Sequence, residues 1–279
     1  MTILRVRHIT TYAYKRPVGF GEHRVLFRPR DSYDQRLLSA EIEVSPTPST
    51  LHWIHDVFGN CVAIASFESK ADELRFETNI MLDHTPNTAP RFRTRRKART
   101  WPLQYDAEDL PDLEPSMRRH YPDEGDEVAT WAKKFVKPSG PTDTGHLLAT
   151  MTMAIRESFT YSRRTNPGTQ PPQVTMITKT GTCRDFALLM MEACRSLGLA
   201  ARFVTGYIYV PSRDGSVNRG GGATHAWCQV FVPGAGWVEF DPTNGIVGNR
   251  DLIRVGVARD PRQAIPLSGT YAGKKDDPQ

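Results

Sequence analysis

Long apolar runs are absent from this chain of 279 residues, whose longest apolar stretches are no longer than segments such as Ala187–Met191. A helix that crosses a membrane needs about 20 apolar residues, so the sequence predicts no membrane-spanning segment. The first residues contain no continuous apolar stretch after their first basic residue, which is unlike a secretory signal peptide. We therefore expect a cytoplasmic protein with no membrane partner.

Cysteine is scarce, and its spacing excludes two further classes of protein. The four cysteines form no CxxC pair and show no zinc-ligand spacing with histidine. A chain of this length, in the compartment expected, does not depend on a disulfide framework. We therefore expect no metal and no cofactor, and the question becomes what an individual thiol does.

Charge of one sign does not dominate, since the sequence has 36 basic and 31 acidic residues, which give a net charge of +5. The exception is the stretch Arg91–Arg99, which holds six basic residues. It contains one aromatic residue, Phe92, and no recognised nucleic-acid motif, so we interpret it as a solvated linker face. Binding of a polyanion by this stretch is the alternative.

The sequence divides into an amino-terminal part rich in short strands and a second part with helices. Residues 1–84 are rich in β-branched and aromatic residues and have a Gly-Asn turn signal at 59–60, which predicts an all-β module. Residues 85–125 have many prolines and charges and predict a linker. Residues 126–265 form the predicted catalytic domain, and residues 266–279 are expected to be a tail.

The second part begins with helical patterns and ends with strands. Apolar residues recur at helical spacing in 145–159, and a shorter helical pattern covers 127–136. Another helix is predicted to begin at Cys183, because Thr182 and Asp185 have capping-box spacing. The strand patterns cover residues 201–210, 224–232 and 237–241, with a glycine-rich loop over 211–223.

Cys183 is the candidate nucleophile because of its position at the start of this helix. The positive end of a helix favours a thiolate. The unpaired backbone N–H groups there can also face a developing oxyanion. The same residue could therefore supply both attack on a carbonyl and stabilisation of the charge that forms.

A cysteine nucleophile needs a base and a group that orients the base. His225 begins one predicted strand, and Asp241 ends the next, after the turn Pro-Gly-Ala-Gly at 233–236. A four-residue turn would place Asp241 opposite Cys228, on the face away from His225. A Cys-His-Asp triad therefore requires a bulge or a different loop.

Three blocks resemble the bacterial transglutaminase-like family, which includes cysteine proteases. The blocks are Gly181-Thr-Cys-Arg-Asp-Phe-Ala187, Thr224-His-Ala-Trp227 and Gly236-Trp-Val-Glu-Phe-Asp-Pro-Thr-Asn244, with Leu197–Tyr207 between the first two. The resemblance implies an α+β fold, with a papain-like or transglutaminase-like core behind an all-β amino-terminal domain. It also implies that Cys183 attacks a carbonyl, His225 carries the proton and Asp241 orients the imidazole.

The sequence also departs from the animal transglutaminases. These enzymes have a tryptophan directly after the nucleophile and calcium sites in extra domains, whereas this chain has Arg184 and no acidic calcium loop. Candidates for a second oxyanion donor are Tyr161 and Gln173, for each of which a packing or surface role is the simpler interpretation. The remaining cysteines are interpreted as buried apolar residues.

The leading hypothesis is a cysteine hydrolase that cuts an amide or isopeptide bond of a peptide or protein through an acyl-enzyme. Acyl transfer from glutamine to an amine is the close alternative, because the same intermediate can react with water or an amine. A polyanion-binding protein without catalysis is the third hypothesis. The sequence assigns no oligomeric state.

Overall fold

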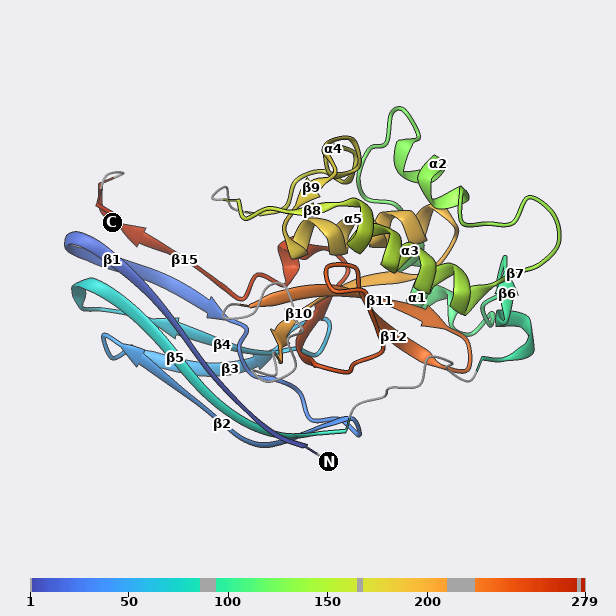
Figure 1. The fold of residues 1–279 in the computed structure, drawn as a ribbon. Coiled ribbons are helices and arrows are strands. Elements are labelled where there is room, and N and C mark those ends of the chain that lie inside the picture. Colours follow the sequence, from blue (N-terminus) through green and yellow to red (C-terminus); the bar gives the residue numbers. More distant parts are fainter. Residues whose placement is uncertain (1, 86–93, 165–167, 210–223, 275–276, 279) are drawn as a thin grey trace. The chain divides into compact units, whose positions relative to one another are not determined.

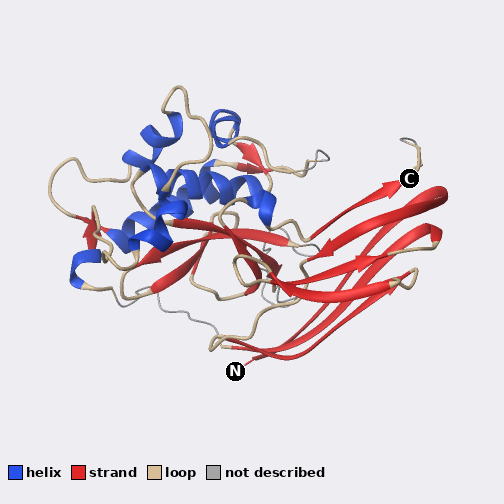
Figure 2. Ribbon diagram, turned by 180° about the vertical axis from the view of Figure 1, so that it is seen from behind, coloured by secondary structure: helices blue, strands red, loops and turns tan. Residues whose placement is uncertain are grey.

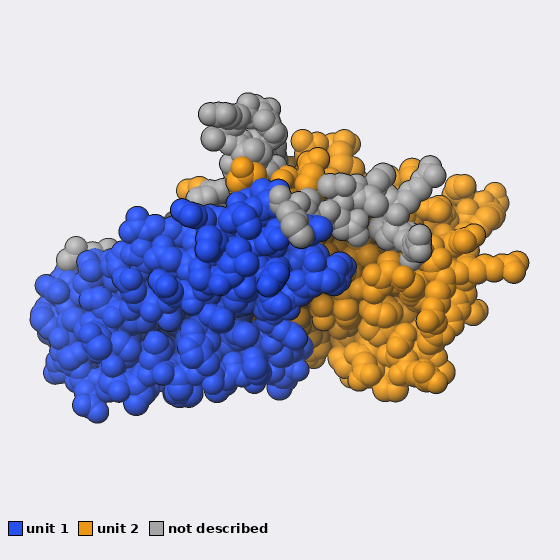
Figure 3. Space-filling view, turned by 90° about the horizontal axis from the view of Figure 1, so that it is seen from below, with its two compact units in different colours: residues 1–86, 253–256, 265–279 blue, residues 87–252, 257–264 orange. Residues whose placement is uncertain are grey.

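The computed structural model describes residues 2–85, 94–164, 168–209, 224–274 and 277–278. The chain divides into two compact units, shown in two colours in Figure 3. The first unit contains residues 1–86, 253–256 and 265–279, and the second contains residues 87–252 and 257–264. Among the described residues, no helix is long and apolar enough to cross a membrane.

The amino-terminal unit consists of strands, as predicted for residues 1–84. Its strands are β1 (Thr2–Val25), β2 (Gln35–Ser45), β3 (Thr50–His55), β4 (Cys61–Ser66), β5 (Lys70–His84) and β15 (Leu267–Ala272). They form one sheet in the order β2-β5-β1-β4-β3, and β15 pairs with β1 (Figure 1). The long β1 and β5 are antiparallel, with Val6 opposite Ile80 and Thr10 opposite Phe76.

One face of this sheet is apolar and supplies the core of the first unit. Alternating strand residues point to the same face, and here they bury a cluster of aromatic and aliphatic side chains. The members with the least exposure are Val18, Val25, Phe27, Ala63, Ala65, Leu74 and Phe76.

The carboxyl-terminal residues differ from the expected tail. Residues 267–272 form β15, which is antiparallel to β1 and places Val25 opposite Leu267. Leu267 and Tyr271 pack against the apolar cluster of the first unit, and the rings of Tyr271 and Tyr14 have centroids 5.2 Å apart. Because the strand pairs with residues more than 240 positions earlier, local sequence could not reveal it.

The second unit combines a sheet with helices. Its strands are β6 (Thr100–Trp101), β7 (Thr142–Asp143), β8 (Thr160–Tyr161), β9 (Thr180–Gly181), β10 (Ala201–Ile208), β11 (His225–Val232), β12 (Gly236–Asp241) and β13 (Ile246–Val247). Its helices are α1 (Leu110–Met117), α2 (Glu127–Lys133), α3 (Thr144–Ser158), α4 (Pro172–Thr178) and α5 (Cys183–Ser196), with short 3-10 turns at Arg96–Ala98 and Pro261–Gln263. The main sheet has the order β13-β12-β11-β10-β14, where β14 covers Leu252–Ala258.

Helix α5 lies at the centre of this unit. It packs on β10 and β11, α2 and α4 pack on α5, and α3 contacts β12; Figure 2 shows these helices gathered on one side of the sheet. Nearly every residue of α5 is buried, including Arg195. The Arg195 guanidinium is satisfied by Glu192 at 2.8 Å and by the carbonyl of Ala201 at 2.8 Å, which ties the helix to the start of β10.

Residues 94–125, within the predicted linker, contain more structure than expected. Strand β6, helix α1 and the 3-10 turn lie here, and the indole N–H of Trp101 donates to the carbonyl of Leu197 at 2.9 Å. Within the basic stretch, Arg95 and Lys97 both pair with Asp106. Residues 91–93 of that stretch lie outside the described residues. The prolines predicted irregular backbone but not the bond from Trp101, because its partner Leu197 lies 96 positions away.

Candidate active site

Cys183 is the first residue of α5, as predicted from the sequence. The capping box is present: Asp185 Oδ2 accepts the backbone N–H of Thr182 at 2.8 Å and its hydroxyl at 2.9 Å. The N–H groups of a first helical turn have no partner within the helix, so the N–H of Cys183 is available to a ligand. Cys183 is buried, with 7% of its surface exposed.

Asp185 fixes more than the helix terminus. Its carboxylate also accepts from the backbone N–H of Gln170 at 2.8 Å and from the Arg164 guanidinium at 2.8 and 3.1 Å. Asp185 has no exposed surface. Capping, rather than contact with a substrate, is therefore the role that its hydrogen bonds support, as the sequence favoured.

His225 and Asp241 come from neighbouring antiparallel strands and form a direct hydrogen bond. His225 is the first residue of β11, Asp241 is the last of β12, and Nε2 of the ring lies 2.9 Å from Oδ2 of the carboxylate. The same Oδ2 accepts from the Asn244 side chain at 2.8 Å, and Oδ1 accepts from the backbone N–H of Thr243 at 2.9 Å. These bonds hold the carboxylate in one orientation.

The strand register explains how the histidine and the aspartate meet. Gly236 pairs with Val232, so the turn contains only residues 233–235 and Phe240, not Asp241, lies opposite Cys228. Asp241 is shifted by one position relative to the four-residue turn, and a shift of one residue moves a side chain to the other face. The positive φ of Gly234 (93°) and Gly236 (75°) makes this tight turn possible.

The pKa of His225 reflects its neighbours. Burial lowers the pKa of the ring, but the charge of Asp241, the hydrogen bond to Asp241 and the Cys183 thiol together raise it to about 10. The other ring nitrogen, Nδ1, has no hydrogen bond of good geometry within the described part of the chain. This nitrogen is therefore the one available for proton exchange with the thiol.

The structure separates the two candidates for a second oxyanion donor. Burial raises the pKa of Tyr161, and the nearby Cys183 thiol raises it further through its charge and a hydrogen bond. The Tyr161 hydroxyl therefore lies beside the nucleophile. The side-chain amide of Gln173 instead donates to Glu127 at 2.8 Å, so its amide is engaged in a packing contact between α4 and α2.

The sequence did not predict two residues that contact the candidate triad. Asn244 supports Asp241, and the Trp227 ring stacks on His225 with centroids 5.9 Å apart and planes at 28°. Asn244 follows the aspartate by three residues, and this short spacing is the signal that could have identified it. Trp227 and His225 are two apart on β11 and share a face, which strand periodicity predicts.

The other three cysteines differ in environment. Cys194 and Cys228 are fully buried, and burial raises the pKa of the Cys194 thiol to about 12 and raises that of Cys228 as well. Cys61 is only half-buried, so its interpretation as a buried apolar residue is wrong. It is the first residue of β4, opposite His55 of β3, and is partly accessible.

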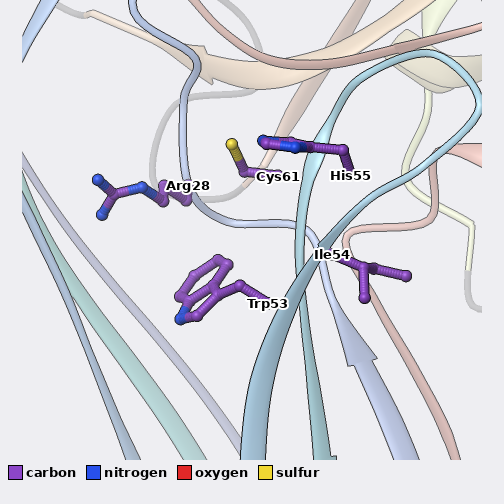
Figure 4. Close-up of a pocket in the computed structure, with 5 residues that line it drawn as sticks. All are labelled: Arg28, Trp53, Ile54, His55 and Cys61. Carbon is purple, nitrogen blue, oxygen red and sulfur yellow. The ribbon is translucent and has the colours of Figure 1, made fainter.

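Cys61 lines a cavity of about 420 Å³ in the first unit. The other lining residues are Arg28, Trp53, Ile54 and His55 (Figure 4). The Arg28 guanidinium carbon lies 5.8 Å from the centroid of the Trp53 ring. None of Cys183, His225 and Asp241 lines this cavity. Cys61 is therefore a suitable reference thiol outside the candidate active site.

Within the described ranges, no group of three or more histidine, cysteine, aspartate or glutamate side chains could hold a metal ion. The predicted glycine-rich loop, residues 211–223, lies outside the described residues.

Comparisons with known proteins cover both units. Residues 4–83 match the bacterial transglutaminase-like N-terminal region, and residues 130–242 match the transglutaminase-like superfamily. An uncharacterized protein of Mycobacterium tuberculosis is 27% identical over 275 residues, covering 95% of this chain and 86% of that protein. One from Mycobacterium leprae is 26% identical over 273 residues, covering 97% of this chain and 94% of that protein.

The fold is also found in a solved structure. The crystal structure of a putative cysteine protease from Cytophaga hutchinsonii superposes with a TM-score of 0.72 at 18% identity, covering 98% of this chain and 90% of that one. The predicted α+β fold with a transglutaminase-like core and a β-rich amino-terminal region is thus confirmed. The chain thus has a transglutaminase-like core, preceded by a region that matches the bacterial transglutaminase-like N-terminal region.

Proposed function

We propose that this protein is a cysteine hydrolase that cleaves an amide or isopeptide bond of a peptide or protein through an acyl-enzyme. The observation that carries the proposal is the buried His225 ring, which is held by Asp241 at 2.9 Å on one nitrogen and exposes the other to the Cys183 thiol. The match of residues 130–242 to the transglutaminase-like superfamily supports the same chemistry, as does the fold that this chain shares with a protein named as a putative cysteine protease.

The proposed reaction has two steps. The proton of the Cys183 thiol passes to Nδ1 of His225, the sulfur attacks the carbonyl carbon, and the oxyanion faces the Cys183 N–H and the Tyr161 hydroxyl. His225 donates the proton from Nδ1 to the leaving amine, which departs and leaves a thioester. His225 then removes a proton from water, which attacks the thioester and releases the carboxylic acid and the thiol. Asp241 and Asn244 keep the ring oriented throughout.

Transfer of the acyl group to an amine is the competing outcome of the same intermediate. Arg184 stands where the animal transglutaminases have an aromatic residue beside the nucleophile, and it is only half-buried. A charged, partly solvated neighbour leaves water access to the thioester, and this favours hydrolysis over transfer.

A peptide library tests the proposal. We expect new amino termini or released ammonia with the wild-type protein, little incorporation of a fluorescent primary amine, and no dependence on added calcium. Cys183→Ser should abolish the products, whereas Cys61→Ser, the matched control at an accessible thiol, should retain them. Products that persist in Cys183→Ser contradict the proposal. Amine incorporation equal to hydrolysis at millimolar amine, lost in Cys183→Ser, supports the transferase instead.

A further inference from the structure

Residues 160–164, which include β8, form one wall beside Cys183. β8 and β9 are parallel, with Thr160 opposite Thr180 and Tyr161 opposite Gly181. The pairing continues where the N–H of Ser162 donates to the carbonyl of Gly181 at 2.9 Å. Two residues further along, the Arg164 side chain forms an ion pair with Asp185 of α5 at 2.8 Å.

Arg163 lies between these two fixed points and therefore runs alongside the start of α5. The second residue of that helix is Arg184, which directly follows Cys183. The pairing of β8 with β9 brings Arg163 to the start of α5. In agreement, the charges of Arg163 and Arg184 lower the pKa of the Tyr161 hydroxyl, whereas the Cys183 thiol raises it. Two positive side chains thus lie close to Tyr161 and Cys183.

The three arginines near the start of α5, Arg163, Arg164 and Arg184, differ in their partners. Arg164 is neutralised by the buried Asp185. Across the ranges that the structure describes, neither Arg163 nor Arg184 has an ion pair or a hydrogen bond to a carboxylate. The nearby carboxylate of Asp241 is engaged by His225 and Asn244, and that of Glu127 by Gln173.

A guanidinium presents several N–H donors in a planar fork that matches a carboxylate. A half-buried arginine without a partner, next to a nucleophile, is therefore suited to an anionic ligand. Arg163 is exposed and Arg184 half-buried, so both can be reached from solvent.

We infer that the acyl donor of this site carries a carboxylate close to the scissile carbonyl, and that Arg184 and Arg163 bind it. This inference rests on the proposed function and specifies its substrate class as acidic peptides. The carboxylate could be an aspartate or glutamate side chain or the free end of a peptide, and both present the same chemistry to the arginines.

Two small alkylating reagents test the inference without the natural substrate. Iodoacetate and iodoacetamide have the same leaving group and nearly the same size, but only iodoacetate carries a carboxylate beside the carbon that sulfur attacks. We would measure both rates at Cys183 by peptide mass spectrometry and take their ratio. His225 favours the anionic reagent equally in every variant below, so changes in the ratio report the arginines.

Arg184→Gln and Arg163→Gln should each lower the iodoacetate-to-iodoacetamide ratio by roughly two- to fivefold, as expected for a partly exposed charge pair. The double variant should lower it further, and the iodoacetamide rate should change less than about twofold. Arg184→Lys, which keeps the charge, should retain most of the ratio. Arg118→Gln is the matched control, since it removes an exposed arginine of the same unit that pairs with Glu114.

The outcomes separate this inference from the proposed function. An unchanged ratio in the double variant, with normal iodoacetamide labelling of Cys183, overturns the carboxylate site and leaves the nucleophile in place. The same fall in Arg118→Gln also overturns it, because the effect would then be one of net charge. Labelling of Cys61 but not of Cys183 by either reagent overturns the proposed function itself.

Peptide cleavage would then identify the source of the carboxylate. Cleavage sites enriched in aspartate or glutamate, with the enrichment lost in Arg184→Gln, support a side-chain carboxylate. Dependence on an unblocked carboxyl terminus supports the terminal carboxylate. Equal cleavage of neutral and acidic peptides by the wild-type protein overturns the inference.

Discussion

His225 is the residue in which the chemistry of the site and the stability of the fold are most directly coupled. Its ring has a pKa of about 10 in the folded protein, compared with 6.5 for an ordinary histidine. A protonated ring at neutral pH is the counter-ion of a thiolate, which is the nucleophilic form of cysteine. The buried Asp241 is what makes that charge tolerable in the core.

This raised pKa predicts a specific dependence of stability on pH. A group whose pKa is raised by folding stabilises the folded state while it is protonated. The contribution of His225 should be complete below about pH 6.5 and should disappear as the pH rises through about 10. His225→Gln keeps an N–H near Asp241 but does not titrate. Urea unfolding from pH 6 to 10.5 should show the wild type losing free energy of unfolding relative to this variant.

The buried thiols do not affect the comparison between the wild type and His225→Gln. Cys194 and Cys228 also have raised pKa values and destabilise the fold when they ionise at high pH, but they are present in both proteins. Parallel pH profiles of the wild type and His225→Gln would show that His225 is not protonated in the folded protein.

At the scale of elements, the capped start of α5 positions Cys183, the proposed nucleophile. Asp185→Asn removes the charge that accepts from Thr182, Gln170 and Arg164. Asp185 is the third residue of α5 and accepts the N–H of the N-cap residue Thr182. Loss of a capping hydrogen bond costs about 0.5–2 kcal/mol, and breaking a buried ion pair costs about 3–5 kcal/mol. Since Arg164 is partly exposed, we expect about 2–4 kcal/mol of destabilisation by urea unfolding, together with slower alkylation of Cys183.

Asp109 provides the control for this prediction. It is the N-cap residue of α1, but its side chain makes no capping hydrogen bond. Asp109→Asn should therefore change the free energy of unfolding by less than about 0.5 kcal/mol. Equal effects of the two substitutions would mean that Asp185 does not anchor the start of α5.

The same elements show where prediction from sequence succeeded. The boundaries of α5 follow from local signals: Thr182 and Asp185 at its start, and Gly198 just after its end, with a positive φ of 76°. The predicted helices at 127–136 and 145–159 correspond to α2 and α3. Local chemistry determines each of these features, so a short window of sequence is sufficient.

The pairing of β11 with β12 shows where prediction from the sequence failed. The residue types of the candidate triad were recognised, but the count of turn residues was wrong by one, because Gly236 belongs to β12 and pairs with Val232. A glycine that tolerates positive φ can be the last turn residue or the first strand residue, and composition does not distinguish the two. Helix α4 was missed for a similar reason, since its sequence begins with prolines.

At the scale of the whole molecule, the first unit is discontinuous in sequence. Residues 253–256 and 265–279 belong to it together with residues 1–86. The side chain of Gln35 donates to the carbonyl of Arg254 and accepts from its N–H, both at 2.8 Å. The N–H of Leu26 donates to the carbonyl of Pro266 at 2.7 Å. The amino-terminal strands alone therefore do not contain all of the bonds that hold this unit.

This discontinuity predicts the effect of shortening the chain. A protein that ends at Ala264 lacks β15, so residues 19–25 of β1 lose one neighbouring strand and keep only their pairing with β4 and β5, and the apolar cluster loses Leu267 and Tyr271. We expect the amides of residues 19–25 to exchange hydrogen at least about tenfold faster, because a strand that loses a neighbour opens locally more often. The amides of β11 should keep their protection, since their partners β10 and β12 remain.

A chain that ends at Lys274 separates the strand from the residues beyond it. It keeps β15 but loses Asp277, which pairs with Arg16 at 2.7 Å and accepts from the N–H of Lys15 through its carbonyl. If β15 supplies the protection, this chain should exchange like the full protein over residues 19–25. Fast exchange in both shortened chains would assign the stabilisation to Asp277 instead. Slow exchange in both would mean that β1 is held by β4 and β5 alone, and the first unit would then be complete without its carboxyl-terminal strand.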